Sequence, residues 1–234
     1  MFSLNSFDKR SAEKEYLDMP DIAENDVLES FRFIRFVNRY GGGHKTIQIA
    51  LAKVLRSWPK DRIVEVMDAG CGMGDMAMAI SDWGRDNRFL IRYRGIDKNN
   101  LIVKLAKERT KKQGIEYEVG DLFDQNLPEV DVIIASMVFH HLGKEEVDRA
   151  LANLLSKSRH ALIINDLTRS FALYSVCYLL TRFVKNKASR VDALLSVKKG
   201  FRPEKMRAHL DKLNVGGIVK EQFCGRLSVI VFKK

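Results

Sequence analysis

The feature that most constrains this fold is an alternation of strand-like and helix-like segments through the middle of the chain. Segments with helical spacing of apolar residues cover 75–83, 99–113 and 144–157. Between and around them lie five short apolar runs, at Ile63–Asp68, Leu90–Asp97, Ile115–Val119, Val130–Ala135 and His160–Asn165. Parallel strands need long crossover connections, so this alternation predicts an α/β fold with a mostly parallel sheet and helices on both faces.

The two ends of the chain depart from this alternation. Residues 24–39 and 44–57 read as helices, and glycines at 41–43 separate them. After the fifth strand we expect an apolar helix over 168–184, a segment over 188–199 that is either helical or irregular, and a helix over 203–213, which opens on Pro203. Two final runs, 215–223 and 226–232, predict a terminal hairpin that would give the sheet one antiparallel strand.

A glycine-rich turn, Asp68-Ala69-Gly70-Cys71-Gly72-Met73-Gly74-Asp75, joins the first strand to its helix. Ligands of open α/β sheets bind at the carboxyl ends of strands, where such a turn lets the backbone approach them closely. The spacing is G-x-G-x-G, unlike the G-x-G-x-x-G of dinucleotide sites, and Asp75 would repel a pyrophosphate. A ligand with a sulfonium and an ammonium group meets no such repulsion, and S-adenosylmethionine is a ligand of this kind.

Two further acidic residues follow later strands. Asp97 ends the second strand, where a carboxylate can accept hydrogen bonds from both ribose hydroxyls. Asp121, after the third strand, is placed to accept from an adenine amino group, with Leu122 against the ring. Each carboxylate alone could belong to an ordinary turn. A phosphate-binding lysine motif is absent from the sequence, which excludes a P-loop enzyme.

The motifs DAGCGMG, GID and GDLF together resemble those of class I S-adenosylmethionine-dependent methyltransferases over residues 60–166. The resemblance implies a Rossmann-like sheet of seven strands in the order 3-2-1-4-5-7-6, with strand 7 antiparallel. It implies a methyltransferase domain over 60–234, with residues 1–59 covering the cofactor site and 168–200 inserted on the acceptor side. The cofactor-binding residues expected from it are Asp68, Ala69, Gly70, Cys71, Gly72, Gly74, Asp97, Lys98, Asp121, Leu122, Ser136 and Met137.

Shorter stretches resemble small bacterial methyltransferases of polyketide and aromatic natural products. These stretches are NRYGGGHKT before the domain core, and NDLTRS and GFRPEKMRAHL after it. They imply a small aromatic or polyketide-like methyl acceptor, with S-adenosylhomocysteine as the second product.

The loop after the fourth strand, 136–142, should face the transferred methyl group and carries the candidate catalytic residues. It has no Asn/Asp-Pro-Pro-aromatic motif, which argues against adenine methylation. It has no Pro-Cys, which argues against cytosine-C5 methylation, and no glutamate, which argues against arginine methylation. His140 and His141 are the candidate general bases, because imidazole titrates near neutral pH. Asp166 and Arg169 follow the fifth strand on the same side, and Arg169 could bind a carboxylate or stabilise a phenolate. Either residue could instead be structural.

The preferred function is methyl transfer to an oxygen of a phenol, hydroxyl or carboxyl group. Carbon methylation of a phenol or quinone ring, RNA or ribosomal methylation, and a non-catalytic cofactor-binding subunit stay open. Basic residues cluster between Arg169 and Arg207, with ten Lys or Arg against two acidic residues. Beside an apolar helix this charge suggests peripheral contact with anionic membranes, and makes nucleic acid the less favoured partner. The sequence leaves monomer and homodimer open.

The cysteines bear on metal binding and on the compartment. Cys71, Cys177 and Cys224 are widely spaced and form no CxxC pair, so we expect neither a disulfide framework nor a metal site. The N-terminal residues lack an apolar core of signal-peptide length, and we expect a cytoplasmic protein.

Overall fold

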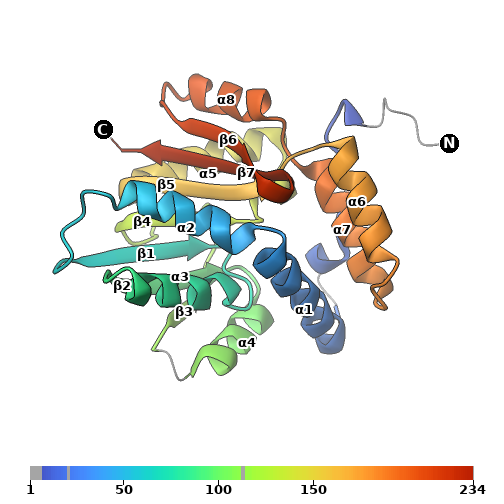
Figure 1. Ribbon diagram of the computed structural model, residues 1–234, viewed down its shortest axis with the longest axis horizontal. Coiled ribbons are helices and arrows are strands. Elements are labelled where there is room, and N and C mark those ends of the chain that lie inside the picture. Colours follow the sequence, from blue (N-terminus) through green and yellow to red (C-terminus); the bar gives the residue numbers. More distant parts are fainter. Residues whose placement is uncertain (1–6, 20–21, 112–113, 234) are drawn as a thin grey trace.

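The computed structural model describes residues 7–19, 22–111 and 114–233, and Figure 1 shows one sheet flanked by helices. The strands are β1 (Ile63–Ala69), β2 (Leu90–Asp97), β3 (Glu116–Val119), β4 (Val130–Ser136), β5 (Ser158–Leu167), β6 (Ile218–Gln222) and β7 (Arg226–Phe232). Their order in the sheet is β3-β2-β1-β4-β5-β7-β6. Strand β7 runs antiparallel to both of its neighbours, while β1 to β5 pair in parallel. The predicted fold class and strand order are confirmed.

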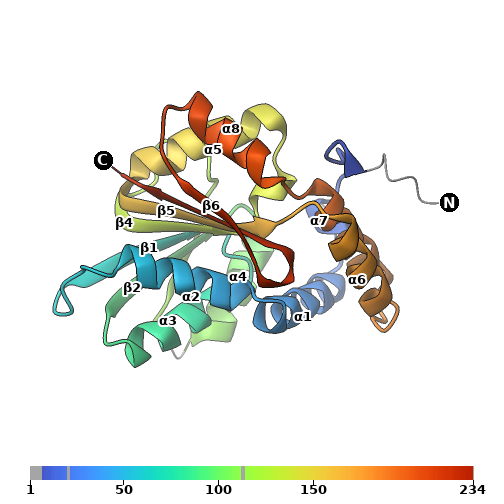
Figure 2. The same cartoon turned by 45° about the horizontal axis from the view of Figure 1, so that its top comes forward.

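Helices cover both faces of the sheet (Figure 2). One face packs on α5 (Lys144–Lys157) and α8 (Pro203–Lys212), and the other on α2 (Gly43–Val54), α3 (Asp75–Asp86) and α4 (Asn100–Thr110). Successive side chains of a strand point to opposite faces. In β1, Met67 therefore belongs to the core under α5, while Val66 belongs to the core under α2 and α3.

Three further helices lie beyond the carboxyl ends of the parallel strands: α1 (Glu24–Tyr40), α6 (Phe171–Thr181) and α7 (Lys187–Lys199) (Figure 1). Helix α7 packs against both α6 and α1. Helix α6 begins three residues later than predicted, because the Ser170 side chain caps it by accepting from the backbone N–H of Leu173. Thr168 is instead bridged to Phe201.

Short 3-10 turns lie near the same end of the sheet: η2 (Tyr16–Asp18), η4 (Phe139–His141) and η5 (Phe223–Gly225). They place residues of the N-terminal arm, of the loop after β4 and of the tip of the β6–β7 hairpin around the same cavity as the glycine turn of β1. In the described part of the chain, no helix combines the length and apolar character needed to cross a membrane.

Candidate active site

The glycine turn after β1 needs its glycines for both conformation and space. Gly70, Gly72 and Gly74 have φ values of 78°, 52° and 70°, in the left-handed region that favours glycine. A Cβ on Gly70 would lie 2.4 Å from the Val138 side chain, and one on Gly72 would lie 2.6 Å from Phe31 of α1. The turn is therefore enclosed by the loop after β4 and by α1.

Two carboxylates flank this turn. Asp68 is buried and accepts a hydrogen bond from the Tyr93 hydroxyl, while its second oxygen has no hydrogen-bond partner among the described residues. Burial, reinforced by repulsion from Asp97 and Asp75, raises the pKa of Asp68 to about 7. Asp97 accepts from the backbone N–H of Gly72 at 3.1 Å and of Asn99 at 3.0 Å, and burial raises its pKa.

One cavity of about 1220 Å³ joins the glycine turn to the His140–His141 loop. Ten residues predicted to bind the cofactor line it: Asp68, Gly70, Cys71, Gly72, Asp97, Lys98, Asp121, Leu122, Ser136 and Met137. Ala69 and Gly74 do not line it: Ala69 is fully buried in the core, and Gly74 faces the Tyr117 hydroxyl. A cavity with a glycine floor and acidic walls fits a positively charged nucleoside such as S-adenosylmethionine, and one oxygen of Asp68 in this wall has no hydrogen-bond partner among the described residues.

The histidine pair forms the opposite wall of the cavity. The η4 turn presents both His140 and His141 to it. The Nδ1 atom of His140 lies 2.7 Å from a carboxylate oxygen of Asp166, and Asp166 also accepts from the backbone N–H of His140 and of Leu167. These contacts hold the pKa of the buried Asp166 below its ordinary value despite its desolvation. The carboxylate thus orients the ring so that Nε2 faces away from Asp166.

Asp166 and Arg169 do not face the acceptor as the sequence suggested. Neither residue lines the cavity, and Asp166 acts only through His140. The Arg169 guanidinium is buried and donates to three backbone carbonyls, those of Phe7, Asp8 and Gly200. The prediction that Arg169 binds an acceptor carboxylate is therefore wrong for this structure, because its donors fix the N-terminal arm.

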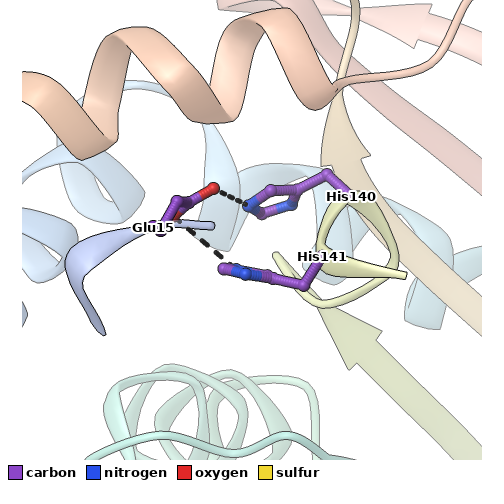
Figure 3. A group of neighbouring side chains, drawn as sticks. All are labelled: Glu15, His140 and His141. Atoms are coloured by element: carbon purple, nitrogen blue, oxygen red, sulfur yellow. Dashed lines mark ion pairs between the residues drawn. The ribbon is translucent and has the colours of Figure 1, made fainter. Parts of the chain in front are cut away.

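The N-terminal arm supplies polar groups that the sequence analysis missed. The Arg10 guanidinium donates to the carbonyls of His140 and Leu142 and clamps the arm onto the histidine turn. This contact places Glu15 beside both rings (Figure 3), with its two oxygens 3.6 Å from Nε2 of His140 and 3.8 Å from Nε2 of His141. No periodicity marks these residues, since their partners lie more than a hundred positions away.

Glu15, His140 and His141 offer ligand atoms within 4.8 Å of one another, a spacing that a metal ion could use. The Lys199 ammonium lies 3.3 Å from a Glu15 oxygen, however, and already compensates that carboxylate. Asp18 accepts from Nδ1 of His141 at 3.0 Å. This arrangement favours a buried ion-pair network over a metal centre.

The rest of the cavity wall is largely apolar. From α6, Leu173, Val176, Cys177 and Leu180 line the cavity, and Phe183, two residues after the helix, joins them. Phe171 and Tyr174 do not line it, because their rings pack edge-on against Phe7 of the arm. The acceptor end of the cavity therefore suits a flat or lipophilic molecule.

Comparisons with known proteins agree with this geometry. A family described as "Methyltransferase domain" matches residues 66–159. The ribosomal protein L11 methyltransferase of Staphylococcus saprophyticus is 26% identical over 150 residues, which are 58% of this chain and 46% of that protein. The chain thus spans about half the length of that relative.

Two solved structures show the same fold at low identity. Magnesium protoporphyrin IX methyltransferase from Synechocystis PCC 6803, with bound SAH, aligns at a TM-score of 0.61 and 16% identity, covering 89% of this chain and 97% of that one. The plantazolicin methyltransferase BamL, in complex with a triazolic desmethylPZN analog and SAH, aligns at a TM-score of 0.66 and 14% identity, with 89% and 97% covered.

The matched domain lies on the strands and turns that build the glycine cradle and its acidic walls. The sheet order, with its antiparallel β7, is that of the class I fold. Residues 66–159 therefore match a methyltransferase domain, and the sheet to which they belong has the class I, Rossmann-like fold.

Proposed function

We propose that this protein transfers a methyl group from S-adenosylmethionine to a hydroxyl oxygen of a small aromatic or lipophilic acceptor, with His140 as general base. The observation that carries the proposal is His140 in the wall of the cavity that starts at the glycine turn, with its Nδ1 atom 2.7 Å from the buried Asp166 carboxylate behind it. A carboxylate on Nδ1 selects the tautomer whose Nε2 can take a proton, and stabilises the imidazolium that results.

On the cofactor side, the chain's own carboxylates do the binding. Asp97 would hold the ribose hydroxyls, Asp121 and Leu122 the adenine, and Asp68 the ammonium group of the methionine part. When bound, S-adenosylmethionine supplies an electrophilic methyl group on a positively charged sulfur. Helix α1, which packs Phe31 onto Gly72, would cover the cofactor with the arm and exclude water.

On the acceptor side, Nε2 of His140 takes the hydroxyl proton while Asp166 holds the ring in place. Nε2 lies 3.6 Å from the nearest Glu15 oxygen, beyond hydrogen-bond distance, so an acceptor hydroxyl would compete with Glu15 for this nitrogen. The apolar wall of α6 aligns the acceptor. Alignment supplies most of the acceleration in an in-line transfer of this kind. All three cysteines are free thiols, so we place this chemistry in a reducing cytoplasm.

The proposal is tested by screening phenols, quinones and fatty acids with a methyl-labelled cofactor. With the best acceptor, His140→Gln should lower the turnover number by about 10²- to 10⁴-fold and leave S-adenosylhomocysteine affinity unchanged. His141→Gln is the matched comparison, because His141 also lines the cavity but lacks the Asp166 contact. A turnover number unaffected by His140→Gln would remove His140 from the chemistry.

Product analysis separates the alternatives. The same base would serve carbon methylation of a phenol ring. If the methyl group of the product were found on carbon, the enzyme would be assigned as a carbon methyltransferase instead of an oxygen methyltransferase. Cofactor binding without turnover on any acceptor would indicate a non-catalytic subunit. Labelling of RNA with salt-sensitive binding would favour a nucleic-acid substrate.

A further inference from the structure

The cavity opens through a rim of exposed apolar side chains. Phe36 and Tyr40 on α1 line the cavity yet are 60% and 64% exposed. The same holds for Val176 and Leu180 on α6 and for Phe183 just after that helix, which are 53%, 61% and 88% exposed. We call these five residues the apolar mouth. Leu179 on α6 (61% exposed) and Phe223 at the hairpin tip (77% exposed) add to the apolar surface beside it. Concentrated apolar exposure of this kind marks an interaction site in proteins.

Phe223 belongs to this surface because its backbone carbonyl oxygen would lie 3.2 Å from a Cβ on Gly42, two residues after Tyr40. On the other side, Leu173 of α6 lies 2.6 Å from the Cβ position of Gly225. The hairpin tip thus bridges the end of α1 and the start of α6, as both Figure 1 and Figure 2 show. The apolar side chains of the three elements therefore ring one opening.

The two segments that carry the mouth are rich in basic residues. Segments 31–40 and 171–191, which contain it, carry seven Lys or Arg and no acidic residue. These are Arg32, Arg35, Arg39, Arg182, Lys185, Lys187 and Arg190. Within the described residues none of the seven forms an ion pair, whereas Arg85, Arg92, Arg94 and Arg159 elsewhere on the surface do.

We propose that the apolar mouth and the basic residues of its two segments dock on an anionic lipid bilayer, from which a lipophilic acceptor enters the cavity. Aliphatic and aromatic side chains flanked by Lys and Arg are the composition of interfacial membrane anchors. Cations contribute to such binding through the negative potential of anionic headgroups. The route of acceptor entry rests on the proposed function, but the docking itself does not.

Two other occupants fit parts of this surface less well. RNA would be held by stacking aromatics, and Val176, Leu179 and Leu180 cannot stack on bases. A second copy of the chain would bring the seven cations of each mouth together, and that repulsion opposes self-association. A bilayer satisfies both the aliphatic and the cationic parts.

Docking is measured by co-sedimentation of the purified full chain with two kinds of vesicle. One contains equal parts of phosphatidylcholine and phosphatidylglycerol, and the other phosphatidylcholine alone. We expect binding to the first, much weaker binding to the second, and release at about 1 M salt, where the screening length falls to about 3 Å. No acceptor is needed, so failure of docking and failure of the methylation proposal are separate results.

Matched variants locate the contact. Arg35→Gln with Arg39→Gln removes two charges near the mouth and should weaken vesicle binding by about 25-fold, because each charge contributes about fivefold. Lys53→Gln with Arg56→Gln removes two exposed charges, one in the last turn of α2 and one just after that helix, at the end away from the mouth, and should leave binding unchanged. Leu179→Ser with Phe223→Ser tests the apolar part, with exposed Leu90→Ser on β2 as its control. Neither Leu179 nor Phe223 lines the cavity, so activity on a soluble phenol should persist.

The proposal fails if the anionic vesicles do not retain the protein at low salt. It also fails if both charge variants lose binding equally, because the contact would then be non-specific. Salt-sensitive RNA binding without vesicle binding, or a dimer that the Leu179–Phe223 variant dissociates, would assign the surface to those partners instead.

Discussion

The raised pKa of Asp68 predicts that cofactor affinity depends on pH near neutrality. Its carboxylate is buried under the glycine turn, where burial is the main cause of a pKa of about 7. Asp97 and Asp75 add repulsion, while the Tyr93 hydroxyl opposes the shift by donating a hydrogen bond. If Asp68 holds the ammonium of the cofactor, only its ionised form binds well. Protonation below pH 7 should therefore weaken binding.

The magnitude follows from the shift. Below pH 7 the ionised fraction of Asp68 falls about tenfold per pH unit, to about 1% at pH 5. The cofactor affinity should therefore be about 100-fold weaker at pH 5 than well above pH 7.

The same pKa shift also affects the stability of the fold. A rise from 3.8 to about 7 is about three units, and ionising Asp68 in the folded protein costs on the order of 4 kcal/mol. That contribution to the free energy of unfolding is present below about pH 4 and is lost as the pH rises through 7.

The assay is calorimetric titration of S-adenosylhomocysteine between about pH 5 and pH 7.5, with circular dichroism to confirm the fold at each pH. Binding near pH 7 should release a proton from Asp68. Asp68→Asn keeps the shape without the charge, so its affinity should be low and nearly independent of pH. A wild-type affinity that stays flat across this window, or an Asn variant that keeps the slope, would refute the assignment of Asp68 to the ammonium.

Three other substitutions test separate parts of the site. Asp166→Asn should lower the turnover number about 10²- to 10⁴-fold with little change in cofactor affinity, because Asp166 acts through His140. Steady-state kinetics in which the turnover number and the cofactor affinity fell together would contradict this. Asp97→Ala should weaken cofactor binding about 100-fold by removing charge-assisted hydrogen bonds, and unchanged affinity in a folded variant would exclude its ribose role. Gly72→Ala should lower the free energy of unfolding by about 1–2 kcal/mol because the residue has a φ of 52°, and further because its Cβ clashes with Phe31. Adding Phe31→Ala should relieve the clash. If chemical denaturation showed that the two substitutions act independently, the contact between residues 72 and 31 would be excluded.

The cofactor half of the site could be predicted from the sequence because its determinants are local. Alternating apolar runs specify strands and helices. The glycine turn lies where a strand ends and the next helix begins. Asp68 and Asp97 reach one cavity because the carboxyl ends of parallel strands meet at one edge of the sheet. Strand topology thus converts residues 29 positions apart into neighbours.

The acceptor half was decided by tertiary contacts that no local pattern encodes. Arg10 reaches the carbonyl of His140 across 130 positions, and that contact brings Glu15 to the histidines. Arg169 looked like an anion-binding residue because it follows β5, yet its side chain turns to the arm, where buried carbonyls accept its donors. Periodicity and spacing report only which face of an element a residue occupies. Which distant segment covers that face depends on how the whole chain packs, and here that packing determines the surroundings of His140.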